Sequence, residues 1–322
     1  MGHPYTAEDK TIAAFTRCIW ILAAVMIAAT IISFSLTGVR VDPLSRPLLL
    51  VPFSVLTATW CLYTYVRPDE RLRALAESFL QLLVILLAGT LMSYAAAVPL
   101  PFQDTNLLAI DTALGIDRQV YIEFFSRRPW LHNAVTLAYF TLMPQFVVVP
   151  LLLFFLKQTH RLQLFIFAAG VGLFATVLIS IFTPSITTIY LDLGLPVGAP
   201  IPDTRYTPLP TLNALRSGLP YWIDLSAAEG LISFPSFHTV GASLFVWALA
   251  SVPYVRWVVA VLNAGLIAAA PFIGAHYFVD IAGGAVVAVA AIAAARTLSR
   301  ASSREATFAA PAEDIDGVTA NG

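Results

Sequence analysis

Two short stretches contain the residues whose types and spacing could support catalysis. The first is Phe-Pro-Ser-Phe-His-Thr at residues 234–239, and the second is Gly-Ala-His-Tyr-Phe-Val-Asp at residues 274–280. They hold His238 and His276, two of only five histidines in the chain. Each histidine lies at the edge of a hydrophobic run, where ionisable side chains are costly to place and often mark function.

His276 and Asp280 are four residues apart, a spacing that brings two side chains onto one face of a helix, about 5–6 Å apart at Cβ. The carboxylate could then accept a hydrogen bond from one ring nitrogen and fix the tautomer. The other ring nitrogen would be free to act as a nucleophile or a base. The alternative is a buried ion pair that only holds helices together.

The Pro235-Ser236 pair is typical of a helix start. The serine hydroxyl and the first backbone N–H groups of a helix can hold a phosphate without a metal. His238, within the first turn, could then donate a proton to a leaving oxygen. The alternative is a simple serine N-cap followed by a histidine at the membrane interface.

The composition indicates a polytopic membrane protein. The 322-residue chain is 58% hydrophobic and 11% charged, with a mean hydropathy of +0.80, whereas soluble domains have about 25% charged residues. Neither nucleic-acid binding nor a metal site is indicated. Cys18 and Cys61 both fall inside hydrophobic runs and are interpreted as small apolar residues.

Eight hydrophobic runs are near the ~20 residues that cross a bilayer as a helix, which predicts an all-α integral membrane bundle of about eight spans. The sixth and seventh runs are short. The runs are residues 11–36, 47–66, 74–98, 131–156, 162–182, 237–253, 257–273 and 276–295.

Basic residues predict the orientation of these spans. With both termini in the cytoplasm, lysine and arginine are in excess on the inner side, as the positive-inside rule expects. His238 and His276 then both lie at the extracytoplasmic end of their helices. We expect a multi-pass protein of the plasma (inner) membrane.

Two segments on the outer side are long. Residues 99–130 contain a short helical pattern at 107–115, preceded by a cap signal at Asp104, which predicts a helix lying along the membrane surface. Residues 184–235 are rich in proline and carry Arg205 and Arg216. A loop of that length usually has a function.

The two histidine stretches resemble signature motifs of the type 2 phosphatidic acid phosphatase superfamily. The form Phe-Pro-Ser-Phe-His with His-Tyr-Phe-Val-Asp is similar to its inositolphosphorylceramide synthase (aureobasidin-target) branch, including bacterial members. The resemblance covers residues 104–295, including the D-x-x-L-G-x-D stretch at 111–117. It implies a six-helix catalytic core with an interfacial helix at residues 99–296, preceded by additional transmembrane helices at 1–98. The Ala-, Ser-, Glu- and Asp-rich composition of the C-terminal residues predicts a disordered cytoplasmic tail at 297–322.

The resemblance also implies roles for individual residues. His276 would be the nucleophile that forms a phosphohistidine, Asp280 its orienting partner, and His238 the acid that protonates the leaving group and later activates the acceptor. Ser236 would bind phosphate, with the adjacent N–H groups. No metal and no other cofactor would be required.

The cationic part of such a site departs from the wider superfamily. Ala270 stands where an arginine is found six positions before the nucleophile, and the lysine-containing first motif is not present. Arg216 is the best substitute and Arg205 the second. The alternative for each is a solvated loop charge or a lipid headgroup contact.

Several other polar residues are expected to have structural positions. For His132 and His160, which flank spans, we expect a place at the membrane interface. Asp111 and Asp117 are expected to have cap or loop roles.

The function predicted on these grounds is transfer or hydrolysis of a phosphoryl-linked group on a membrane lipid. The donor would be a phospholipid or a polyprenyl phosphate. The acceptor would be a lipid or sugar alcohol, with water as the close alternative. A non-enzymatic lipid transporter or scaffold is the alternative of another class, and a vanadate-dependent haloperoxidase is disfavoured by the hydrophobicity and the missing arginine.

Overall fold

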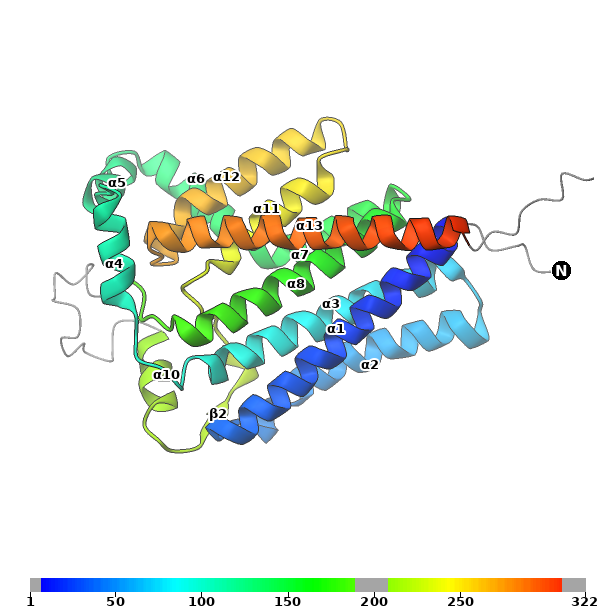
Figure 1. Ribbon diagram of the computed structural model, residues 1–322, viewed down its shortest axis with the longest axis horizontal. Coiled ribbons are helices and arrows are strands. Elements are labelled where there is room, and N and C mark those ends of the chain that lie inside the picture. Colours follow the sequence, from blue (N-terminus) through cyan, green and yellow to red (C-terminus); the bar gives the residue numbers. More distant parts are fainter. Residues whose placement is uncertain (1–6, 189–207, 309–322) are drawn as a thin grey trace, which may run out of the picture.

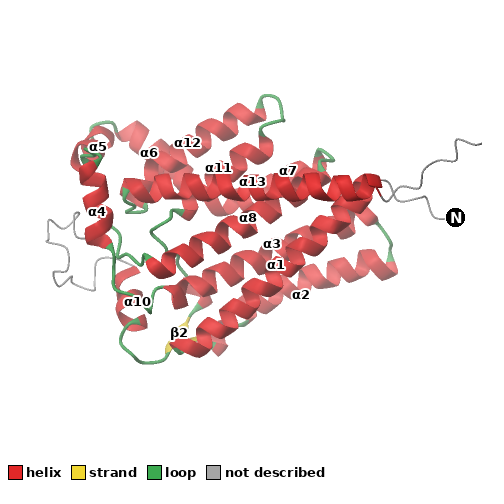
Figure 2. Cartoon of the chain, in the orientation of Figure 1, coloured by secondary structure: helices red, strands yellow, loops and turns green. Residues whose placement is uncertain are grey.

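A computed structural model describes residues 7–188 and 208–308, and its regular structure is almost entirely helical (Figures 1 and 2). The predicted fold class, an all-α membrane bundle, is confirmed. The long helices are α1 (Ala7–Thr37), α2 (Pro47–Cys61), α3 (Glu70–Ala96), α8 (Thr159–Phe182), α12 (Val255–Ile273) and α13 (Phe278–Phe308). The shorter ones are α4 (Asp104–Ala113), α5 (Arg118–Ser126), α6 (Pro129–Tyr139), α7 (Leu142–Phe155), α10 (Pro208–Leu215) and α11 (Phe237–Leu249).

Within the described ranges, six helices are long and apolar enough to cross a membrane, compared with the eight spans expected. They correspond to α1, α2 with its short flanking turns, α3, α8, α12 and α13. The expected fourth run is divided between α6 and α7, which would make a seventh span if counted as one. The expected sixth run is α11, which has 13 residues. At 1.5 Å per residue it is too short to cross ~30 Å of hydrocarbon.

The break between α6 and α7 has a cause in the sequence. The two helices are bent by 61° relative to each other. Pro144 lies in the first turn of α7, where its missing N–H is tolerated, but its ring excludes a helical carbonyl four residues earlier, at Phe140. The helix therefore ends at Tyr139 and restarts at Leu142, and the bend leaves Tyr139 at the end of α6.

α8 is the central helix of the bundle and packs against α1, α3, α11 and α13. Helices in a membrane associate mainly through close packing, which small residues permit. Gly89 of α3 shows this: a Cβ atom there would lie 2.2 Å from Leu173 Cδ2 of α8. α2 packs on α3 at the outside and buries none of its residues.

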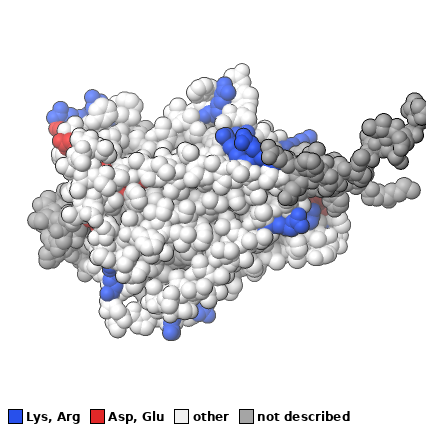
Figure 3. Space-filling model, viewed as in Figure 1, with Lys and Arg blue, Asp and Glu red and all other residues white. Residues whose placement is uncertain are grey.

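One end of the bundle carries most of the non-helical and short elements (Figure 1). There, β1 (Val39–Val41) and β2 (Tyr221–Ile223) form a two-stranded parallel sheet with Val39 paired to Tyr221. In Figure 1, α4 runs across this end of the bundle and contacts α13. On the face shown in Figure 3, charged groups lie toward the two ends and the surface between them is largely uncharged.

Candidate active site

The site is built where α11 and α13 begin. Ser236 is the N-cap of α11, as expected, and its hydroxyl accepts from Thr239 N at 3.4 Å. The Ser236 N–H donates to the Asp280 carbonyl at 2.9 Å. Gly284 permits this approach, because a Cβ there would lie 2.4 Å from the Ser236 carbonyl oxygen. This glycine therefore allows α13 to lie close to the start of α11.

His276 precedes its helix instead of lying within it. α13 begins at Phe278, so the expectation that His276 and Asp280 share a helix face is corrected in detail. Asp280 is the third residue of the helix and reaches back, accepting from Tyr277 N at 3.0 Å and contacting His276 Nδ1 at 3.2 Å. This is the geometry of a capping box, in which an acidic side chain binds the N–H that precedes the helix.

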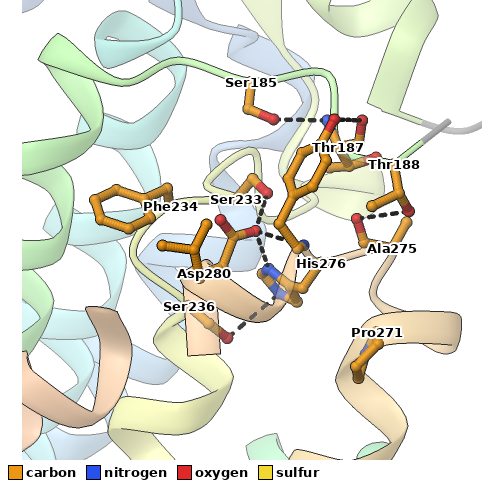
Figure 4. Close-up of polar contacts among 12 residues, drawn as sticks. Ser185, Thr187, Thr188, Ser233, Phe234, Ser236, Pro271, Ala275, His276 and Asp280 are labelled. Atoms are coloured by element: carbon orange, nitrogen blue, oxygen red, sulfur yellow. Dashed lines mark hydrogen bonds and ion pairs between the residues drawn. The ribbon is translucent and has the colours of Figure 1, made fainter. Parts of the chain in front are cut away.

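Asp280 holds the imidazole through one ring nitrogen (Figure 4). Its side chain is fully buried, and Ser233 Oγ also donates to the same carboxylate oxygen at 2.6 Å. A neutral ring that donates from Nδ1 carries its lone pair on Nε2. His276 Nε2 lies 3.4 Å from Ser236 Oγ, so this second ring nitrogen is directed toward the start of α11.

The structure brings the two histidines together, as expected. The ring centroids of His238 and His276 are 5.7 Å apart. On its other side, His238 stacks on Tyr139 of α6, with centroids 4.3 Å apart and an interplanar angle of 15°. Tyr139 is the last residue of α6, so the bend that follows it places its ring against His238.

A cavity of about 660 Å³ opens beside the histidines, and His238, His276 and Tyr139 line it. Among the described residues of its lining, Glu229 is the one carboxylate and there is no lysine or arginine. Glu229 is held in place, since its carboxylate accepts from Thr211 Oγ1 at 2.8 Å and its N–H donates to the Tyr94 hydroxyl at 3.0 Å. The remaining wall is mixed, with the polar side chains of Thr90, Ser93 and Thr187 among apolar ones.

Arg216 is not brought to this site. Its guanidinium donates to the carbonyl of Ala97 at 3.0 Å and to that of Leu100, and it lies 3.9 Å from the centroid of Phe102. Arg216 therefore binds the peptide carbonyls that follow α3, and it does not line the cavity. Burial lowers the pKa of Arg216. The geometry gives no support to Arg216 as the phosphate clamp, and Arg205 lies outside the described residues.

Asp104 and Asp111 have tertiary partners that the sequence analysis did not foresee. Asp104 does not cap α4, whose N-cap Gln103 has no side-chain cap bond; instead it accepts from Ser185 Oγ at 2.7 Å. Asp111 does have a cap role, but for α13: it accepts from Phe278 N at 2.8 Å and Val279 N at 2.9 Å. Burial raises the pKa of both carboxyls, while their hydrogen bonds oppose the rise.

The other polar residues named from the sequence bind elsewhere in the structure. Asp117 is the N-cap of α5, as expected, and accepts from Gln119 N and Val120 N. His132 stacks on Phe272, and His160 Nε2 lies 3.1 Å from Ser299 Oγ. Across residues 7–188 and 208–308, no group of three or more His, Cys, Asp or Glu side chains could hold a metal ion.

The chain matches a known protein family. A family model described as the PAP2 superfamily matches residues 105–294, which include both histidines and Asp280. No curated protein and no solved structure matches the chain. The matched residues run from α4 into α13 and leave α1, α2 and α3 outside. With more than half of its residues matched, this multi-pass membrane protein belongs to the PAP2 superfamily.

Proposed function

We propose that the protein transfers a phosphoryl-linked group from a membrane lipid through a phosphohistidine at His276 Nε2. One observation carries this proposal: Asp280 binds Nδ1, while Nε2 faces Ser236 Oγ at 3.4 Å beside the cavity. Superfamily membership supports a phosphatase-type or phosphotransferase-type enzyme that acts on lipid phosphate.

The reaction has two steps. First, Nε2 of His276 attacks phosphorus, the P–N bond forms and the P–O bond to the leaving group breaks, while His238 donates its proton to the departing oxygen. Then an acceptor hydroxyl attacks phosphorus and gives its proton to His238, and the P–N bond breaks. Asp280 stabilises the positive charge that His276 acquires in the first step.

Phosphate oxygens would be held by the start of α11. Ser236 offers its hydroxyl, and the N–H groups of Phe237 and His238 have no hydrogen-bond partner among the described residues. The positive end of a helix macrodipole favours an anion at this position. Arg205 remains a proposed cationic contribution, whereas Arg216 is left out because its guanidinium binds peptide carbonyls.

The acceptor is proposed to be an alcohol, with water as the alternative. Glu229 supports a sugar alcohol, because its carboxylate in the cavity wall can accept hydrogen bonds from the further hydroxyl groups that such an acceptor carries and water does not. The resemblance to the inositolphosphorylceramide synthase branch points the same way. The donor would be a phospholipid or a polyprenyl phosphate, and the site would face the extracytoplasmic side of the plasma (inner) membrane.

Mass spectrometry of products tests the proposal. Purified protein is incubated with a panel of phospholipids and polyprenyl phosphates, with and without lipid or sugar alcohols. We expect a phosphorylated alcohol that wild-type protein makes and His276→Ala protein does not. Release of free phosphate alone, unaffected by any alcohol, would support the hydrolytic alternative. Turnover by the His276→Ala protein at the wild-type rate would exclude His276 as the nucleophile.

A further inference from the structure

α4 presents two carboxylates to the segment that carries His276, although neither belongs to the catalytic pair. Asp104 and Asp111 are seven residues apart, about two turns, and both are buried on the inward face of the helix together with Leu107. Ile110 and Leu114 lie on its exposed side, 43% and 65% accessible. Burying two acids in place of apolar groups is costly unless each is well hydrogen-bonded.

Asp111 completes the start of α13. The first N–H groups of any helix have no partner within the helix. Here Asp280 takes that of Tyr277, while Asp111 takes those of Phe278 and Val279 from a helix 167 and 168 residues away in sequence. A carboxylate also suits the positive end of the helix macrodipole. The first turn of α13, and with it the direction of Asp280, therefore depends on α4.

Asp104 binds the residue that follows His276. It accepts from the Tyr277 hydroxyl at 3.2 Å, and Tyr277 is fully buried directly after His276. Asp104 also accepts from Ser185 Oγ and Ile186 N, and these bonds fix the loop at residues 185–188. This loop binds the residue before His276, since Thr188 N donates to the Ala275 carbonyl at 2.9 Å (Figure 4).

Ala275, directly before His276, has a left-handed backbone conformation that alanine does not favour. Its φ is 49°, a region that residues with a side chain adopt infrequently. Such conformations persist only where the surroundings over-determine them, and they cluster at functional sites. The contacts from α4 and from 185–188 are the surroundings that do so here.

We propose that Asp104 and Asp111 are positioning residues that aim His276 Nε2 at phosphorus, so that α4 controls the rate of the chemical step without touching substrate. The inference rests on the proposed phosphohistidine mechanism. Misplacement of a catalytic group by about 1 Å can lower a rate on the order of 10²-fold. Loss of Asp111 should therefore lower kcat strongly and leave KM nearly unchanged.

Asp117 provides a matched control. It caps α5 through two backbone N–H groups, as Asp111 caps α13, but it has no contact with the His276 segment. We expect Asp111→Ala to lower kcat on the order of 10²-fold and Asp117→Ala to leave kcat within about threefold of wild type. Asp111→Asn, which keeps the shape and one acceptor oxygen, should recover part of the loss and serves as the measurement if the alanine variant does not fold.

A double-mutant cycle separates positioning from general stability. If Asp111 acts through the Asp280–His276 pair, its replacement in an Asp280→Ala background should cost less than about threefold in kcat, because the hydrogen bond that orients His276 is already absent. Full multiplication of the two losses, or an equal loss from Asp117→Ala, would overturn the inference. Failure of the proposed function looks different: wild-type protein itself would then form no phosphohistidine.

Discussion

The first turns of α11 and α13 lie side by side, yet their backbone N–H groups have different partners. At α13, carboxylates of Asp280 and Asp111 take the N–H groups of three successive residues at 2.8 to 3.0 Å. At α11, the hydroxyl of Ser236 takes one at 3.4 Å. The N–H groups of Phe237 and His238 have no partner within the described part of the chain.

This difference suits the two helix starts to different roles. A helix start whose donors are all bound by carboxylates cannot bind phosphate, but it is rigid and suits the group that must be aimed. A helix start with free donors and a neutral cap is an anion site. This difference supports the proposal that the nucleophile lies beside the start of α13 and that phosphate binds at the start of α11.

Asp280→Asn should have the largest effect, because Asp280 binds both the N–H group that precedes α13 and the proposed nucleophile, His276. Tyr277 N–H, Ser233 Oγ and His276 Nδ1 all meet one oxygen of Asp280, so the amide oxygen would take that place, and the negative charge that stabilises protonated His276 would be lost. We expect a fall in kcat of about 10³–10⁴-fold, the size found when an analogous orienting carboxylate is replaced. Steady-state kinetics measure it, with Asp117→Asn as the control; a loss below tenfold would contradict the orienting role.

Ser236→Asp would make the start of α11 resemble that of α13. Aspartate caps helices as well as serine does, but position 236 is fully buried, so thermal unfolding of the variant is measured beside its activity. The added charge would repel phosphate and occupy its donors, and we expect activity to fall about 10²–10³-fold, the range for loss of one transition-state donor. Ser236→Ala, which leaves the N–H groups free, should lose less. Equal activities of the aspartate and alanine variants would show that phosphate does not bind at this helix start.

Glu229→Gln tests the acceptor side of the cavity. Loss of a charge-assisted hydrogen bond to an acceptor hydroxyl should reduce transfer relative to hydrolysis by about tenfold, since such bonds contribute about 1.5–3 kcal/mol. The ratio of phosphorylated alcohol to free phosphate measures this. Asp224→Asn, at an exposed carboxylate whose hydrogen-bond partner among the described residues is Ser226, is the control. An unchanged ratio would remove Glu229 from acceptor binding.

Arg216→Ala should have the smallest effect on catalysis. Its bonds to Ala97 and Leu100 and its contact with Phe102 tie the residues after α10 to the end of α3. We expect a loss of about 1–3 kcal/mol in stability with kcat within about threefold of wild type. Thermal unfolding and kinetics on the same preparation check both. A loss of activity without a loss of stability would restore Arg216 as a clamp.

Local sequence patterns predicted the residues whose partners are near in sequence. The four-residue step predicted the contact of His276 with Asp280, and the serine before an apolar run predicted the cap of α11. Hydropathy predicted the membrane class and six of the long helices. The meeting of His238 and His276 followed from placing both at one membrane face.

The remaining features depend on tertiary contacts that have no local signal. Nothing in the sequence pairs Asp111 with Phe278, or Ser233 with Asp280, because the donors are a backbone N–H in one case and a loop hydroxyl in the other. Arg216 could have bound phosphate, but unpaired carbonyls at the end of α3 lie within its reach.

The break before Pro144, in contrast, did have a local signal, since proline excludes a helical residue four positions earlier.

The most direct test of the account is to trap the covalent intermediate. Protein incubated with phosphorus-labelled lipid donor in the absence of an alcohol acceptor is quenched in alkali, where phosphohistidine persists, and the peptides are mapped by mass spectrometry. We expect label on His276, which is lost when acceptor is added and is absent from the His276→Ala protein. Label on another residue, or unlabelled protein that still turns over its donor at the full rate, would contradict it.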